Sequence, residues 1–110
     1  MLDTPRTPVT IEVLHVDDCP NVALLIERLS ASATAAGVGV EPMLVLVESH
    51  DLSNELRFGG SPTLRIDGVD PFPTDGTPSF GCRLYAHDGA FDGSPSISQL
   101  TTVLMQSTVS

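Results

Sequence analysis

The residue with the clearest capacity for chemistry is Cys19, which lies between an apolar segment and an amphipathic segment. A thiol just before a helix meets unpaired backbone N–H groups and the positive end of the helix dipole, which both favour the thiolate. The thiolate attacks disulfides and binds soft metals. Asp17 and Asp18 precede Cys19, and their negative charges oppose the thiolate. The segment predicts thiol chemistry, against the alternative of an unreactive cysteine at a helix N-cap.

Two further residues bear on this chemistry. His15 precedes Cys19 by four residues, but together with Asp17 and Asp18 it gives no zinc-site spacing, so we interpret it as a half-buried strand histidine and predict no metal. Cys82 would lie at the far end of the sheet from Cys19 in a simple hairpin, whereas a disulfide needs Cα atoms within about 7 Å. An inert core cysteine is the favoured interpretation, and a resolving thiol for Cys19 is the alternative.

The elements that must position Cys19 follow from the hydrophobic pattern. Residues 9–16 predict a strand with apolar residues on both faces, which is typical of a central strand. Residues 20–36 predict a helix that starts at Pro20 and stops at Gly37, because Val22, Leu25, Ile26 and Leu29 recur at helical spacing. Residues 38–47 hold the next strand, with its dense apolar part at residues 43–47. A strand–helix–strand unit of this kind predicts two parallel strands.

The second half of the chain has shorter elements. The pattern predicts a helix over residues 49–58 capped by Ser49, a strand over 63–66, a strand over 82–85, and a terminal helix capped at Ser94 or Ser96. Residues 67–81, from Asp67 to Gly81, are rich in Pro, Gly and Asp and predict a long loop. Loops of this length inside a small domain often carry function.

Composition limits the classes of partner. The net charge is −9, the chain has no lysine, and its five arginines are dispersed. Nucleic acids and anionic membranes need clustered positive charge, so both are disfavoured as partners. No apolar run approaches the roughly 18 residues of a membrane span, and the N-terminus does not resemble a secretory signal. Two cysteines do not make a disulfide scaffold, which indicates a reducing, cytoplasmic location. We expect one domain over residues 9–106, with tails over 1–8 and 107–110.

The order β-α-β-α-β-β-α resembles the thioredoxin fold, with Cys19 after the first strand and Pro62 before the third. The resemblance implies an α/β fold with a mixed four-stranded sheet and helices on both faces. In that family the catalytic cysteine begins the first long helix, which matches Cys19, and a cis-proline that shapes the substrate groove matches Pro62. The residues implied to line this groove are Pro20, Asn21, Ser61, Pro62 and Thr63.

More narrowly, the chain is similar to small bacterial thioredoxin-like proteins labelled DF family (seleno)proteins. The matching segments cover most of residues 9–105 and include residues 19–21, 60–68, 70–72 and 81–85. Some members carry selenocysteine at the cysteine position, which implies a redox or soft-nucleophile role. The resolving cysteine of thioredoxin is replaced here by Val22, so the motif is the monothiol form Cys-Pro-Asn-Val.

Two functions of different classes follow. The first is a cytoplasmic monothiol redox protein, in which Cys19 attacks a disulfide or another soft electrophile, and Cys82 or an external thiol resolves the product. Its partners would be a small-molecule thiol or a protein disulfide, with no cofactor. The second is a non-catalytic module that binds a peptide, a partner protein or a soft metal beside Pro62. The sequence leaves open whether the protein is a thiol-disulfide oxidoreductase or such a module.

Overall fold

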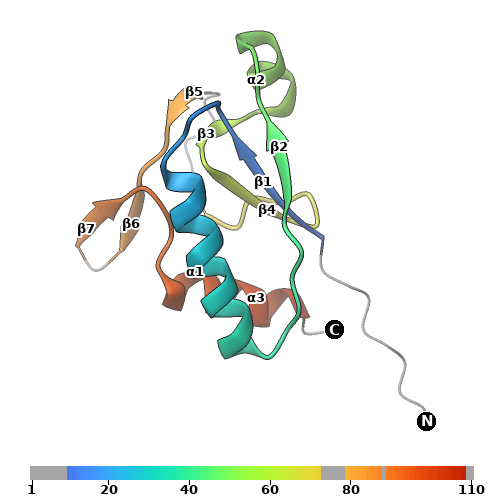
Figure 1. Cartoon of the computed structure of the whole chain (residues 1–110), viewed down its shortest axis with the longest axis vertical. Coiled ribbons are helices and arrows are strands. Elements are labelled where there is room, and N and C mark those ends of the chain that lie inside the picture. Colours follow the sequence, from blue (N-terminus) through green and yellow to red (C-terminus); the bar gives the residue numbers. More distant parts are fainter. Residues whose placement is uncertain (1–9, 73–78, 88, 109–110) are drawn as a thin grey trace.

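A three-stranded sheet with the order β2-β1-β4 forms the centre of the protein (Figure 1). The structure is a computed structural model that describes residues 10–72, 79–87 and 89–108, except for the side chains of residues 79, 80, 82, 87 and 108. Strand β1 (Ile11–His15) pairs parallel with β2 (Met43–Leu46) and antiparallel with β4 (Thr63–Ile66). The predicted parallel pair is therefore confirmed. The expected tail over residues 1–8 lies outside the described residues.

Helix α1 (Asn21–Ala36) joins β1 to β2. It begins one residue later than predicted, because Pro20 is the N-cap and not the first helical residue. It ends as predicted at Gly37, whose φ of +72° is a left-handed conformation that glycine adopts at little cost. The Gly37 N–H donates to the carbonyl groups of Ala33 and Thr34, which satisfies acceptors of the last helical turn.

The two shorter helices also form close to their predicted positions. Helix α2 (His50–Leu56) is capped by Ser49, whose hydroxyl accepts from the Leu52 N–H at 3.1 Å. Helix α3 (Ile97–Thr108) is capped by Ser96, and Ser96 and Gln99 exchange two side chain–backbone hydrogen bonds. This reciprocal pair is a capping box. Helix α3 extends two residues past the expected domain end at residue 106. No helix in the described ranges is long and apolar enough to cross a membrane.

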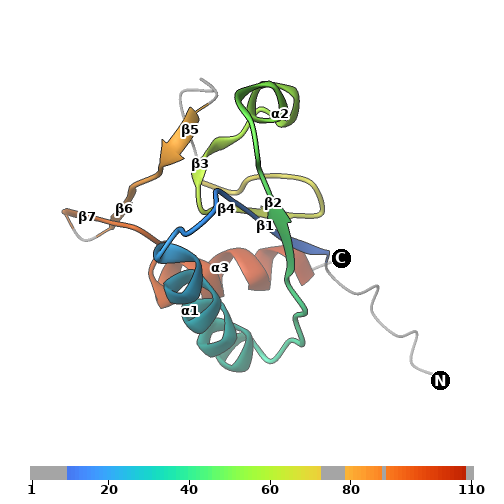
Figure 2. The same ribbon diagram turned by 45° about the horizontal axis from the view of Figure 1, so that its top comes forward.

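Helices cover the sheet from both sides (Figure 2). Ile11 and Val13 of β1 point to one side, where they share a buried cluster with residues of α1 and α3. Leu14 points to the other side and packs with Val47, Phe58 and the apolar residues of α2. Because successive strand residues face opposite ways, the apolar residues on both faces of β1 required this two-sided cover.

The prediction of one continuous strand over residues 82–85 is wrong. Strand β5 (Ser79–Cys82) ends there and pairs parallel with β3 (Gly59–Ser61), while β6 (Tyr85–His87) pairs antiparallel with β7 (Ala90–Asp92). Among the described residues, the sheet around β1 has three strands and not four.

The outer edge of β4, where the fourth strand was expected, is already hydrogen-bonded. The Ile66 N–H donates to the Val69 carbonyl within a tight turn, and the Leu64 backbone bonds to the Tyr85 hydroxyl. Both groups would otherwise pair with a neighbouring strand. A side chain and a turn therefore occupy the place that the backbone of a fourth strand would take at this edge.

Candidate functional site

Cys19 lies in the loop that links β1 to α1. It is a free, half-buried thiol two residues before the first residue of α1. Its carbonyl accepts from the Val22 N–H at 3.3 Å, and no side chain caps the helix N-terminus. The N-terminal end of a 16-residue helix therefore lies next to the thiol. This is the placement that the sequence predicted for a reactive cysteine.

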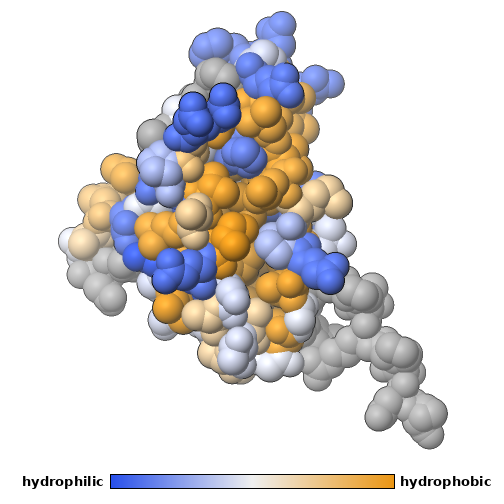
Figure 3. All heavy atoms as spheres, in the orientation of Figure 1, coloured by the Kyte–Doolittle hydropathy of each residue, from blue (hydrophilic) through white to orange (hydrophobic). Residues whose placement is uncertain are grey.

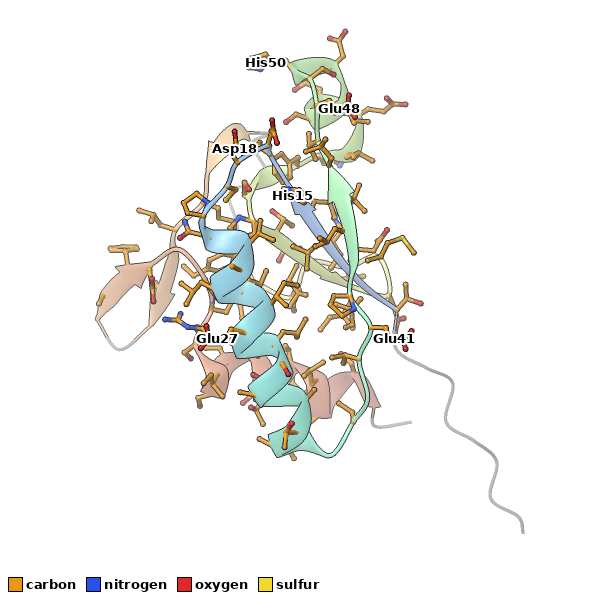
Figure 4. The ribbon with its side chains drawn as sticks, viewed as in Figure 1. His15, Asp18, Glu27, Glu41, Glu48 and His50 are labelled. Atoms are coloured by element: carbon orange, nitrogen blue, oxygen red, sulfur yellow. The ribbon has the colours of Figure 1, made fainter. Side chains whose placement is uncertain are left out.

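The polar residues around Cys19 have structural roles. Asp17 and Asp18 are exposed in the turn after β1, and Asp18 adopts a left-handed φ of 55° while its N–H donates to the Asp17 carboxylate. His15 is half-buried at the end of β1, with Nδ1 3.0 Å from the Val16 carbonyl oxygen (Figure 4). The interpretation of His15 as a strand histidine is confirmed. In the described part of the chain, no three His, Cys, Asp or Glu side chains are grouped to hold a metal ion.

The Cys19 loop is hydrogen-bonded to the segment before β4. The Ser61 hydroxyl accepts from the Val16 N–H at 3.1 Å, although the two residues are 45 positions apart. Ser61 is fully buried, so this bond is shielded from water. The Ser61–Pro62 peptide bond is cis, the isomer that the resemblance implied. The cysteine loop and the cis-proline segment therefore lie against one another.

The residues expected to line a substrate groove divide into two groups. Ser61, Pro62 and Thr63 are buried, and Thr63 is hydrogen-bonded to the Gly60 carbonyl and to Arg83. They support the Cys19 loop from beneath and do not form an open wall in this structure. Pro20 is exposed and Asn21 is half-buried beside Cys19, so the accessible surface is on the helix side.

Asn21 is held by a close approach that the sequence did not reveal. A Cβ atom on Gly93 would come within 2.3 to 2.6 Å of the end of the Asn21 side chain, so a larger residue there would displace that side chain. Asp92, the preceding residue, forms an ion pair with Arg28 of α1 at 2.8 Å. The segment after β7 is thus packed along the first turns of α1, close to the candidate site.

The backbone of Cys82 lies at the same end of the molecule as Cys19. The simple hairpin that would put Cys82 at the far end of the sheet does not form, because β5 pairs with β3 and not with β4. In this pair Cys82 is the partner of Ser61, the residue that is hydrogen-bonded to the Cys19 loop. The Cys82 side chain is outside the described part of the structure, so its role as a resolving thiol stays a prediction.

A buried arginine, which the sequence analysis missed, holds the base of the site together. The Arg83 side chain is only 5% exposed, and its guanidinium bonds to the Asp70 carboxylate at 2.5 Å and to the Phe72 carbonyl at 2.9 Å. The backbone N–H of Arg83 also donates to the Ser61 carbonyl at 2.9 Å. Asp70 and Phe72 come from the first part of the predicted loop, which therefore lies against Arg83; residues 73–78 of that loop lie outside the described residues. One sequence feature could have revealed this role: Arg83 is a charged residue inside an otherwise apolar, strand-like segment.

Tyr85 extends this network to the cis-proline. Its hydroxyl donates to the Pro62 carbonyl at 2.5 Å, and its ring lies 4.4 Å from the Arg83 guanidinium. Burial raises the pKa of Tyr85 well above its ordinary value of about 10, more than the Arg83 charge lowers it. Tyr85 is buried, so its hydroxyl is not open to a substrate.

The raised pKa of Tyr85 predicts loss of stability at alkaline pH. The unfolded phenol releases its proton near pH 10, whereas the folded phenol keeps it, so folding is favoured fully below about pH 10 and progressively less above it. We expect the free energy of unfolding to fall by up to about 1.4 kcal/mol per pH unit in this range. Tyr85 is the only tyrosine and the chain has no lysine, so few other groups obscure the effect.

Ultraviolet absorbance of the phenolate, recorded with circular dichroism, measures this directly. Phenolate should appear only as the protein unfolds, and the Tyr85→Phe variant should lose this pH dependence. Phenolate formation near pH 10 with native circular dichroism would contradict the expectation.

Comparison with known proteins adds no relative to this geometry. The chain matches no protein-family model, no curated protein and no solved structure. Functional inference therefore starts from Cys19, the helix that follows it and the buried segment that supports its loop.

Proposed function

We propose that this protein is a monothiol redox protein that exchanges disulfides through Cys19. The observation that carries the proposal is the position of the free thiol. It is half-buried at the uncapped N-terminus of α1, on a loop hydrogen-bonded to the segment of the cis-proline. The uncapped N-terminus of α1 follows the thiol within two residues, and partial exposure lets a target reach the sulfur.

The reaction is an ordinary thiol–disulfide exchange. The Cys19 thiolate attacks one sulfur of a target disulfide, a new S–S bond forms, and the old one breaks. The second target sulfur leaves as a thiolate and takes a proton from solvent. A second thiolate then attacks the mixed disulfide and releases Cys19 as a thiolate. Across the cycle one target sulfur leaves as a thiol, the other target sulfur ends in a disulfide with the second thiol, and Cys19 is unchanged.

The architecture supports a thioredoxin-type arrangement for this chemistry. The parallel β1–α1–β2 unit, β4 antiparallel to β1, and α3 beside α1 follow the order that the resemblance implies. Cys19 stands between β1 and α1, and Pro62 directly precedes β4. The element order agrees from β1 to β4 apart from the short strand β3 before Pro62, and the last helix is also present.

The buried segment beneath the loop has a positioning role in this proposal. Ser61 and Pro62 are too buried to contact a target, but Ser61 fixes the Val16 backbone and thereby the entry to the Cys19 loop. Arg83 and Tyr85 hold the carbonyl groups of Ser61 and Pro62 in turn. A thiol on a fixed loop loses little conformational freedom when it reacts, which favours attack.

Two thiols are candidates for the resolving step. Val22 removes the intrahelical option, so the second thiol is Cys82 or an external small-molecule thiol. The pairing of Cys82 with Ser61 supports the first candidate, because it puts the Cys82 backbone beside the segment that supports Cys19. A cycle that uses reduced thiols requires a reducing compartment, so we propose a cytoplasmic location.

Site-resolved reaction with oxidised glutathione tests the proposal. The Cys82→Ser variant should form one mixed disulfide, at Cys19, and mass spectrometry of peptides should locate it there. We expect the folded variant to react about two- to fivefold faster than the same variant unfolded in denaturant, because only the folded chain has the helix N-terminus beside the thiol. Equal or slower reaction in the folded state would show that the site does not activate Cys19, and the proposal would fail.

A further inference from the structure

Strand β2 is an apolar edge of the central sheet. Within the described residues it pairs only with β1, so its other side has no neighbouring strand (Figure 1). Three of its four side chains are exposed: Met43 by 59%, Leu44 by 54% and Leu46 by 39%. Edge strands are usually shielded by charges or proline within the strand, and the four residues of β2 contain neither.

The backbone of β2 has hydrogen-bonding groups that face outward. The Val47 N–H donates to the His15 carbonyl of β1 at 2.7 Å. Because strand residues alternate in direction, Met43 and Val45 also face β1, whereas Leu44 and Leu46 direct their N–H and carbonyl groups away from the sheet. An added strand would therefore find two donors and two acceptors at regular spacing.

The surface on the α1 side of β2 is also apolar (Figure 3). Leu44 and Leu46 lie on this side, since they pair with Val13 and His15 of β1. A cavity of about 370 Å³ lies alongside, between α1 and the chain that leads into β2; Ile26, Leu29, Ala33, Val38, Val40 and Pro42 are among its lining residues. Apolar surface on this side of the sheet therefore continues from β2 to the chain that precedes it.

Charge selects the kind of strand that fits. Glu41 and Glu48 are exposed beyond the two ends of β2 (Figure 4), roughly 23 Å apart along an extended chain. The chain as a whole carries a net charge of −9. A segment with an apolar centre and a basic residue at each end would match both the edge and its flanking carboxylates.

A second copy of this chain fits less well. If the β2 strands of two copies paired antiparallel about a twofold axis, the outward-facing residues Leu44 and Leu46 of one copy would pair with the same residues of the other. The axis would then lie at Val45 or within one residue of it. If the twofold axis passes through Val45, Glu41 of one copy pairs with Ser49 of the other copy. Glu41 then also lies beside Glu48 of that other copy. Like charges in such positions oppose pairing, and each copy adds its net charge of −9.

We propose that β2 is a docking edge for an extended segment of another protein, apolar at its centre and basic at both ends, which adds to the sheet as a strand. The backbone groups of Leu44 and Leu46 supply the hydrogen bonds, and Glu41 and Glu48 fix the position along the edge. This binding is separate from the exchange reaction and does not require the Cys19 thiol.

A labelled nine-residue peptide tests the proposal by fluorescence anisotropy with the full chain. The probe has a centre of alternating valine and threonine with two arginines at each end. We expect saturable binding. A peptide N-methylated at the amides that would face β2 should bind about tenfold more weakly, and so should one with glutamates in place of the arginines.

Variants locate the site. Leu46→Lys and Leu44→Pro should each weaken binding about tenfold, because one adds like charge at the edge and the other removes an outward N–H. Leu84→Lys is the matched control, since Leu84 is equally apolar and 65% exposed but lies outside the β2 edge, and it should bind as the wild type does. Cys19→Ser should also bind normally, which separates this test from that of the exchange reaction.

Three outcomes would overturn the proposal: no saturable binding, equal binding of the N-methylated peptide, or equal loss in Leu84→Lys. Sedimentation of the free protein decides the occupant. A concentration-dependent dimer that disappears in Leu44→Pro would assign the edge to a second copy and overturn the proposed partner.

Discussion

Replacing Cys19 by serine should abolish disulfide exchange. In reduction of hydroxyethyl disulfide by glutathione, we expect the protein-dependent rate to fall on the order of a hundredfold or more, because a serine hydroxyl is not ionised at neutral pH and cannot form the mixed disulfide. Circular dichroism and thermal unfolding should remain close to those of the wild type, since the side chain is half-buried and outside both apolar clusters.

The Cys82→Ser variant is the control and also identifies the resolving thiol. Unchanged turnover would assign resolution to glutathione, and accumulation of a Cys19 mixed disulfide would assign it to Cys82. Either result retains Cys19 as the nucleophile. Turnover that persists in Cys19→Ser and disappears in Cys82→Ser would move the chemistry to Cys82 and disprove the assignment of Cys19.

The second large effect is on stability, in the Arg83→Met variant. Methionine retains much of the side-chain volume but leaves the Asp70 carboxylate and the Phe72 carbonyl without their partner. Breaking a buried ion pair from one side costs about 3–5 kcal/mol, and the cost is smaller here because Asp70 is 24% exposed. We expect a loss of about 3 kcal/mol from a total on the order of 5–15 kcal/mol.

Urea unfolding followed by circular dichroism measures this loss, and the melting temperature should fall by roughly 10–20 °C. The double variant Arg83→Met, Asp70→Asn is the control. It removes the unpaired charge and should recover part of the loss, which a pure packing defect would not allow. A loss below about 1 kcal/mol in the single variant, typical of a surface ion pair, would contradict the assigned role of Arg83.

Local pattern was sufficient for the elements that position Cys19. The helical spacing from Val22 to Leu29, Gly37 at the helix end and Ser49 at a cap each act within a few residues, so their physics is visible in the sequence. The apolar residues on both faces of residues 9–16 likewise predicted a central strand with cover on both sides. Helix and strand boundaries consequently agree with prediction to within one or two residues at most ends.

The prediction failed where the interaction joined distant residues. The segment 82–85 has the composition of a strand, but its path is decided by Arg83, which bonds to Asp70 and Phe72, and by Tyr85, which occupies the edge of β4. No local periodicity encodes which side chain will satisfy a strand edge. The close approach of Gly93 to Asn21 is of the same kind.

The sequence by itself thus determined the thiol, the helix that begins beside it and the central strand before it, because each depends on neighbouring residues. Only the tertiary structure decided that Cys82 pairs with Ser61, that Ser61 supports the Cys19 loop, and that the cis-proline segment is buried. These features depend on which backbone and side-chain groups satisfy one another across 20 or more positions, and that choice is made by the packing of the whole chain.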